Sequence, residues 1–256
     1  MAKNETGNLT VYALQNGSAL GIENVDIQIV STKRPSGHFK SPPTFTAKTR
    51  LSGEVSFKNI PLGTYDVYVS REGYVSATEK NVLVNISGTD SLGNFCKPHN
   101  TVSLKLEPVH FLSFTGSKLC WIKAGKEHKC WVAVSGGVGH QKKEQQNLPF
   151  KGPLPEGEWD VPQSRYQQMP DRDWVERVFA ELSQTKWPGG KSSWGRNRVW
   201  LQPRPGTNTH GRTGFSIHGG DTPGSAGCVD LTTAMPDFAS EFVSYGKDLV
   251  LKVKYQ

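Results

Sequence analysis

The 256-residue sequence lacks any apolar run of the roughly 18 residues that a membrane-spanning helix needs. Its start, MAKNETGNLTVYAL, also lacks the basic leader and the long apolar block of an ordinary signal peptide. We therefore expect no membrane span, and a protein that is made in the cytoplasm without a signal peptide.

Cysteine is scarce, with four residues: Cys96, Cys120, Cys130 and Cys228. No two of them form a CxxC pair, so the spacing of a structural zinc site is absent, and we expect neither a metal nor another cofactor. Cys120 and Cys130 flank AGKEH, which is typical of a hairpin turn and would let them face each other. The sequence leaves open whether they form a disulfide or remain two packed thiols.

A dense basic segment is also missing, although the formal net charge is +7. Such a balance suits an acidic partner, namely nucleic acid, an anionic membrane surface or a cell-wall polymer, and it also suits a solvated surface without a partner. The basic residues are scattered, and Lys142 with Lys143 is the densest cluster. We therefore expect no nucleic-acid partner.

Residues 1–107 predict an all-β domain. Seven short runs are rich in β-branched and aromatic residues and are separated by Gly, Pro, Asn and Ser. They are NLTVYAL, VDIQIVS, TFTAKTR, GEVSFKNI, TYDVYVSR, NVLVNIS and TVSLKLE. The alternation predicts that Tyr65, Val67 and Val69 share one face of their strand. Seven such strands favour a small β-sandwich.

The stretch GEVSFKNIPLGTYDVYVSREGY resembles the repeat of transthyretin-like and carboxypeptidase-regulatory-like domains. In that repeat a strand, a Pro-Gly turn and a Tyr-bearing strand lead to Gly-Tyr, and Pro61 and Gly63 suit the tight turn. The resemblance implies an accessory, docking or spacer module. No cluster of Cys, His and Asp in this half suggests catalysis, and we expect His38 and His99 to be surface residues.

Residues 108–256 predict a second, β-rich domain. Short strands are expected at 111–114, 118–122, 130–134, 158–161, 198–201 and 214–217 and in DLVLKVKY. DRDWVERVFAELSQ and PDFASEFVSYG predict helices, the second starting near Pro236 and stopping at Gly246, and WPGGKSSWGRN is expected to be an exposed loop. The predicted fold class is mainly β, with an N-terminal β-sandwich and a C-terminal β-rich α+β domain.

The segment FSIHGGDTPGSAGCVDL holds the candidates for chemistry, because His218 precedes Cys228 by ten residues with glycines between them. A Cys–His pair is sufficient for acyl transfer. We expect a helix N-terminus just after Cys228 to stabilise its thiolate, an oxyanion hole from the N–H groups of Gly227 and Cys228, and an accessible His218 ring. The alternative is a buried core thiol with a structural histidine.

The sequence IHGG…SAGCVDL resembles the active-site signature of L,D-transpeptidases, the cysteine enzymes of peptidoglycan. That signature is His-Gly, a spacer and Ser-His-Gly-Cys, and His218, Gly219, Ser225 and Gly227-Cys228 match it. Ala226 stands where the family usually has a second histidine, and the spacer is shorter than usual. WVAVSGG, GPLPEGEWDV and GRTGFSIHGG resemble, in the same order, the effector-like branch that bacterial type VI secretion delivers, which tolerates a small residue there.

The resemblance implies an L,D-transpeptidase or L,D-carboxypeptidase that acts on tetrapeptide stems of peptidoglycan through a Cys228 thioester, with D-amino acid exchange as a further outcome. The backbone carbonyl of Gly219 would orient the base, His218. Arg212 would hold a substrate carboxylate, with an ordinary surface arginine as the alternative, and His210 is a second candidate for that wall. We expect Asp230 to cap the following helix.

The resemblance also implies where such an enzyme would act, because its substrate lies outside the cytoplasm. Either a contractile secretion machine exports the chain, with residues 1–107 docking to a carrier, or the chain is truncated. In the first case the enzyme would be an antibacterial toxin in the periplasm of a target bacterium. An immunity protein in the producing cell would then be a partner.

Three other functions also fit parts of the sequence. A zinc-dependent cell-wall peptidase could use His210, His218 and Asp221, but it leaves Cys228 unexplained. A non-catalytic protein could bind the cell wall or a partner through a sandwich and a degenerate catalytic domain. A papain-like protease normally places its cysteine before its histidine in the chain, and the order here is reversed.

Overall fold

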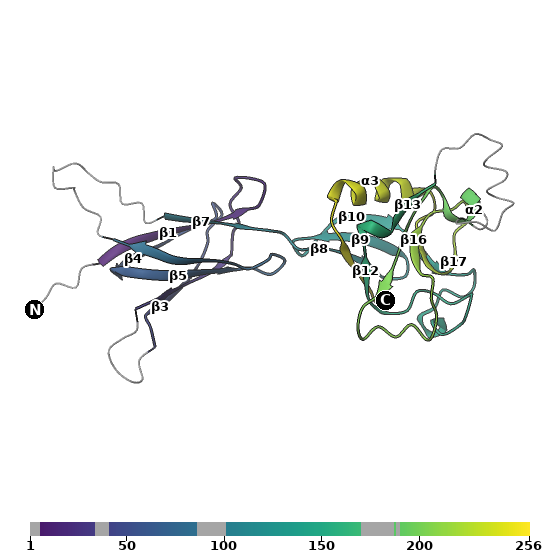
Figure 1. The fold of residues 1–256 in the computed structure, drawn as a ribbon, viewed down its shortest axis with the longest axis horizontal. Helices are drawn as coiled ribbons and strands as arrows, with labels where there is room; N and C mark the ends of the chain where they lie inside the picture. Colours follow the sequence, from purple (N-terminus) through teal and green to yellow (C-terminus); the bar gives the residue numbers. More distant parts are fainter. Residues whose placement is uncertain (1–5, 34–40, 86–100, 170–186, 188–189) are drawn as a thin grey trace, which may run out of the picture. The chain divides into compact units, whose positions relative to one another are not determined.

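The computed structural model describes residues 6–33, 41–85, 101–169, 187 and 190–256. It divides into two compact units, Met1–Val109 and His110–Gln256 (Figure 1). The fold class is mainly β, as predicted. Among the described residues, no helix is long and apolar enough to cross a membrane.

The first unit is a sandwich of two sheets around one core. One sheet has the order β4-β1-β7 and the other β3-β2-β5-β6. The strands are β1 (Thr6–Gln15), β2 (Asp26–Ser31), β3 (Thr44–Lys48), β4 (Glu54–Pro61), β5 (Gly63–Ser70), β6 (Ala77–Val84) and β7 (Thr101–Leu106). Each of the seven predicted runs overlaps one of these strands, although the run at 81–87 covers only the second half of β6 and its last two residues lie outside the described part of the chain. Both sheets contribute apolar side chains to the same buried cluster.

The alternation in β5 shows how this core is built. Tyr65, Val67 and Val69 are buried on one face, as predicted, while Tyr68 and Ser70 are exposed on the other. The Tyr65 hydroxyl donates a hydrogen bond to the carbonyl of Pro61 at 2.8 Å. This bond ties the β4–β5 turn to the core.

The second unit contains two further sheets, with the orders β10-β9-β8-β18-β12-β15 and β11-β17-β16-β14-β13. The first comprises β8 (His110–Phe114), β9 (Lys118–Lys123), β10 (Lys126–Val132), β12 (Gly157–Val161), β15 (Gln202–Pro203) and β18 (Leu249–Val253). The second comprises β11 (Val134–Gly136), β13 (Tyr166–Gln168), β14 (Asn197–Trp200), β16 (Ser216–His218) and β17 (Ser225–Asp230). One buried cluster, which includes Trp159, Ile217 and Val229, joins the two sheets.

The helices of this unit match the sequence only in part. Helix α3 (Met235–Tyr245) has Pro236 in its first turn and stops at Gly246, whose φ of 68° is left-handed, as predicted. The expected loop WPGGKSSWGRN instead contains the short helix α2 (Gly190–Trp194), and that prediction was wrong. The helix predicted for DRDWVERVFAELSQ lies outside the described residues, as do His38 and His99. The described part of the unit also contains three single turns of 3₁₀ helix: Lys143–Gln145, Gln163–Arg165 and Thr232–Ala234.

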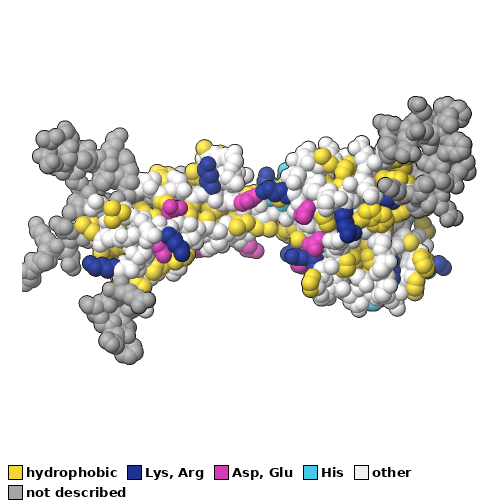
Figure 2. Space-filling model, viewed as in Figure 1, with side chains coloured by type: hydrophobic (Ala, Val, Ile, Leu, Met, Phe, Trp, Pro, Cys, Tyr) yellow, Lys and Arg dark blue, Asp and Glu magenta, His cyan; other side chains and the backbone are white. Residues whose placement is uncertain are grey.

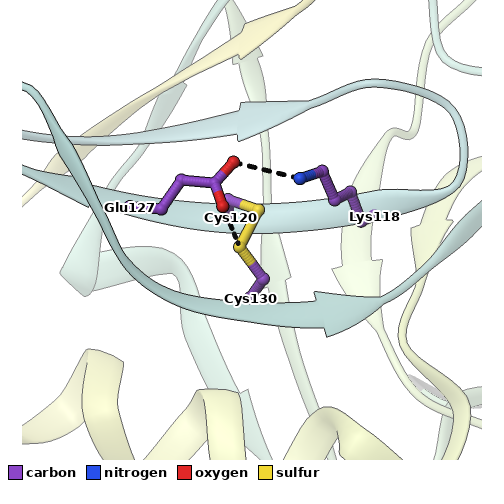
Figure 3. Close-up of a disulfide and its surroundings, with 4 residues drawn as sticks. All are labelled: Lys118, Cys120, Glu127 and Cys130. Atoms are coloured by element: carbon purple, nitrogen blue, oxygen red, sulfur yellow. Dashed lines mark hydrogen bonds and ion pairs between the residues drawn. A yellow bond between two sulfur atoms is a disulfide. The ribbon is translucent and has the colours of Figure 1, made fainter.

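Cys120 and Cys130 form a disulfide, which resolves the alternative that the sequence left open. The two residues are paired across the antiparallel strands β9 and β10. Figure 3 shows the bridge beside Glu127, whose carboxylate forms a 3.0 Å ion pair with Lys118. The bridge therefore fastens a hairpin of the first sheet.

The charged side chains are interspersed on the face that Figure 2 shows. Lys and Arg lie among Asp and Glu there, and the described residues of that face form no continuous basic patch. This distribution agrees with the scatter of basic residues along the sequence.

Candidate active site

Two neighbouring strands bring His218 and Cys228 to one face of the second sheet. β16 and β17 run parallel, and their register pairs Ile217 with Val229 and His218 with Asp230. Because successive residues of a strand point to opposite faces, Cys228 shares the face of His218 and Asp230. Ile217 and Val229 fill the core on the other face.

The surroundings of Cys228 differ from the prediction. Cys228 lies inside β17, and helix α3 does not begin until Met235, so the expected helix N-terminus is not beside the thiol. The segment is a strand because it pairs with β16 on one side and with β11 on the other. The helix dipole therefore does not explain how a thiolate would be stabilised.

The Cys228 sulfur faces polar groups although the residue is only 5% exposed. It accepts a hydrogen bond from the Ser216 hydroxyl at 3.3 Å and lies 3.7 Å from the carbonyl oxygen of Gly214. The side chain of His218 also interacts electrostatically with it. A cysteine that merely filled the core would have apolar neighbours around its sulfur, so these contacts argue against a purely structural thiol.

The electrostatics of the pair favour its charged form. Burial raises the pKa of the Cys228 thiol, but the hydrogen bond and charge of His218 and the Ser216 hydroxyl together bring it below its ordinary value. Burial lowers the pKa of His218, but its interactions with Cys228, Gly219 and Asp230 together bring it above its ordinary value. These interactions favour a thiolate beside an imidazolium.

The orientation of His218 agrees with one prediction and contradicts another. Its Nδ1 lies 2.5 Å from the carbonyl oxygen of Gly219, the contact expected to orient the ring, and this contact leaves Nε2 for Cys228. His218 as a whole is only 3% exposed, so the expectation of an accessible histidine was wrong. Gly219 must stay small, because a Cβ there would come 2.6 Å from the carbonyl oxygen of Thr232.

Ser225 and Gly227 shape the backbone around the cysteine. The Ser225 hydroxyl accepts from the Cys228 N–H at 3.0 Å and donates to the Cys228 carbonyl at 3.1 Å. The expected oxyanion hole therefore loses one of its two donors to an internal hydrogen bond. Gly227 has a left-handed φ of 104°, and a Cβ there would lie 2.3 Å from a terminal nitrogen of Arg212.

Arg212 is held by backbone carbonyls, and its predicted role as a clamp for a substrate carboxylate was wrong. Its Nη1 donates to the carbonyls of Gln146 and Pro153 at 2.6 and 2.7 Å. Its Nη2 donates to those of Gly152 and Ala226 at 2.7 and 3.4 Å. These four bonds use all hydrogens of both terminal nitrogens, so Arg212 anchors residues 146–153 to the segment just before Cys228.

Two other predicted residues have different surroundings from those expected. His210 is exposed in the loop before β16, where its backbone N–H donates a hydrogen bond to the side-chain oxygen of Asn208. Asp230 is 1% exposed and accepts from the N–H groups of Gly224 and Thr232 at 3.0 and 2.8 Å, so it braces both ends of β17. It does not cap α3, which has no side-chain cap.

The zinc alternative finds no support in the arrangement of its proposed ligands. Among the described residues, the group of His, Cys, Asp and Glu close enough to share a metal is Cys120, Glu127 and Cys130, and both of its sulfurs are in the disulfide. Asp221, a proposed ligand, instead accepts a hydrogen bond from Ser192. The structure does not bring the proposed ligands His210, His218 and Asp221 together.

Ser216 and Arg198 were not predicted as site residues, yet both share the sheet face of His218. The β14–β16 register pairs Arg198 with His218 and Trp200 with Ser216. Burial lowers the pKa of Arg198 to about 10, against an opposing effect of Cys228. Ser216 could have been found from its position two residues before His218 in a predicted strand.

No family model matches the chain, and no curated protein matches it. Among solved structures it is similar to L,D-transpeptidase 1 of Mycobacterium tuberculosis, with 12% identity, 94% of this chain and 97% of that chain covered, and a TM-score of 0.34. An L,D-transpeptidase from Mycobacterium smegmatis is 14% identical over 98% of this chain and 96% of that chain, with a TM-score of 0.32. The major pilin subunit of Bacillus cereus is 10% identical over 40% of this chain, with a TM-score of 0.24, and the chain spans only 30% of its length. Similarities this low assign neither a family nor an activity to the chain.

Proposed function

We propose that the chain is a cysteine-dependent L,D-transpeptidase or L,D-carboxypeptidase that acts on the tetrapeptide stems of peptidoglycan. The observation that carries the proposal is the Cys228–His218 pair, with opposite pKa shifts that favour thiolate and imidazolium. It lies within a segment whose His-Gly and Ser-x-Gly-Cys residues match the signature of that family. A Cys–His pair whose pKa values are shifted in these directions is suited to acyl transfer.

In the proposed reaction, the Cys228 thiolate attacks the carbonyl carbon of the diaminopimelate–D-Ala bond. The S–C bond forms, the C–N bond breaks, and the leaving amine of D-Ala takes a proton from the His218 imidazolium. The resulting thioester is then resolved by a nucleophile that gives a proton to His218. Water gives hydrolysis, a free D-amino acid gives exchange, and the amine of a second stem gives a cross-link.

The wider biological role rests on the motif resemblance. We propose that the protein is an antibacterial effector that a contractile machine exports and that acts in the periplasm of a target bacterium. The sandwich of residues 1–107 would dock to a carrier of that machine, and residues 108–256 would carry the catalysis. An immunity protein that covers the Cys228 site would protect the producing cell.

The decisive experiment is incubation of the protein with tetrapeptide muropeptides, with and without D-Met, and identification of the products by mass. We expect release of D-Ala by the wild type, none by Cys228→Ala, and inhibition by iodoacetamide but not by EDTA. His218→Ala should lose the activity, whereas His128→Ala, a change at an exposed histidine of the same unit, should retain it. Equal D-Ala release from wild type and Cys228→Ala would refute the proposal, and no release from a folded wild type would favour a non-catalytic binding protein.

A further inference from the structure

Arg198 is a buried cation held among three tryptophans. Its guanidinium carbon lies 3.9 Å from the ring centroid of Trp187, 4.8 Å from that of Trp194 and 4.5 Å from that of Trp200. Its Nε donates to the Gln167 side-chain oxygen at 2.8 Å, and only 3% of the residue is exposed. Cation–π contacts of this kind fix a planar guanidinium in position and compensate part of its lost hydration.

This cage adjoins the Cys–His pair directly. Arg198 and His218 are paired across β14 and β16, so both side chains stand on the same sheet face. The Trp194 ring contacts both, with its centroid 4.9 Å from that of the imidazole. Trp194 therefore packs against the guanidinium and the catalytic histidine at once, and a shift of Arg198 would reach His218 through that ring.

The charges around Cys228 show which group can replace the missing helix dipole. Asp230, on the same strand, adds a negative charge, and His218, on β16, is the proton partner. Among the described residues, guanidinium groups that interact electrostatically with Cys228 belong to Arg198 on β14 and to Arg212 in the loop before β16. Arg212 is committed to the backbone of residues 146–153, whereas Arg198 is built into the sheet beside the pair.

We propose that Arg198, held in its tryptophan cage, is a positioning residue that keeps Cys228 in the thiolate form and fixes the His218 ring through Trp194. The inference rests on the proposed function, since it takes Cys228 as the nucleophile. A role in packing alone would be served better by an apolar side chain, because burying a guanidinium costs solvation free energy. The fixed positive charge instead opposes protonation of the sulfur.

The test is a pH titration of the thiolate in the absence of substrate. The ultraviolet absorbance of the thiolate is measured as the difference between each protein and the same protein carrying Cys228→Ser. This difference isolates Cys228 and requires no reagent to reach a buried sulfur. Two charges about 10 Å apart at an effective dielectric constant of about 20 shift a pKa by about one unit. We therefore expect Arg198→Gln to raise the midpoint of the Cys228 titration by about one pH unit. At any pH below that midpoint, the fraction of Cys228 in the thiolate form would fall about tenfold.

Two further variants make the result specific. Arg204→Gln removes the same charge from an exposed arginine paired with Glu158 and Asp160, and its midpoint should equal that of the wild type. Arg198→Lys keeps the charge but not the planar group, and it should shift the midpoint in the same direction by a smaller amount. If Arg198→Gln and Arg204→Gln have the same midpoint, or if Arg198→Gln does not fold and a folded Arg198→Met, which also removes the charge, has the midpoint of the wild type, the inference is refuted. Failure of the wild type to release D-Ala would instead overturn the proposed function and leave this titration result as it stands.

Discussion

Replacing Arg212 should destabilise the second unit through lost hydrogen bonds. Its terminal nitrogens donate to four carbonyls, those of Gln146, Gly152, Pro153 and Ala226. A hydrogen bond contributes about 1 kcal/mol net to stability, and more where a buried acceptor is left unpaired. Arg212→Met, which keeps the length of the side chain, should therefore lower the free energy of unfolding by about 4 kcal/mol. Arg212→Lys should lose about half as much, because one ammonium cannot reach all four carbonyls.

Tryptophan fluorescence during urea unfolding measures the stability of the second unit, since all seven tryptophans lie within residues 110–256. The control is Arg204→Met, which removes a surface arginine whose ion pairs with Glu158 and Asp160 contribute at most about 1 kcal/mol. Equal unfolding midpoints for Arg212→Met and Arg204→Met would show that the carbonyl cluster does not hold residues 146–153 in place. A loss with Met that Lys partly restores would support the anchoring role.

Three other substitutions test separate parts of the structure. Ser216→Ala removes the hydroxyl that donates to the Cys228 sulfur. The pKa of Cys228 and the lower pH limit of D-Ala release should therefore both rise by about one unit. The control, Ser135→Ala, changes a buried serine that accepts from the N–H of Leu154, and it should leave both quantities unchanged. Gly227→Ala places a Cβ against Arg212 at a left-handed φ, and it should cost at least about 2 kcal/mol of stability and most of the activity; unchanged urea unfolding would contradict the close approach. Tyr65→Phe removes the bond to Pro61 and should lower the stability of the sandwich by about 1 kcal/mol, read by circular dichroism, with no effect on tryptophan fluorescence.

The strands and helix α3 were predictable because their signals are local. In β5, the alternation of Tyr65, Val67 and Val69 with more polar residues predicts both the strand and which of its faces is buried. In α3, Pro236 and Gly246 mark the two ends through their own backbone preferences. The contact of His218 with the Gly219 carbonyl was predictable for the same reason, since the two residues are adjacent.

The parts that sequence could not give depend on partners far along the chain. Arg212 binds backbone carbonyls, which every residue carries and no side-chain pattern reveals. The cage of Arg198 needs Gln167, Trp187 and Trp194 to converge, and the glycine-rich segment around α2 gives no periodic pattern to place two of them. Cys228 was expected near a helix because glycines precede it, whereas pairing with two neighbouring strands decides its conformation.

The register of β16 and β17 links the core of the second unit to its candidate chemistry. Ile217 pairs with Val229, and both must be buried for this sheet to cover the core. A slip of one residue between the strands would point the Cys228 side chain toward the core and bring Val229 beside His218. It would also remove Asp230 from the face that it shares with His218. The apolar residues at 217 and 229 therefore fix the register that sets Cys228 beside Ser216 and His218. Disruption of this core pair should abolish the pKa shifts of Cys228 and His218 even where both residues remain in the sequence, because those shifts arise from contacts across the two strands.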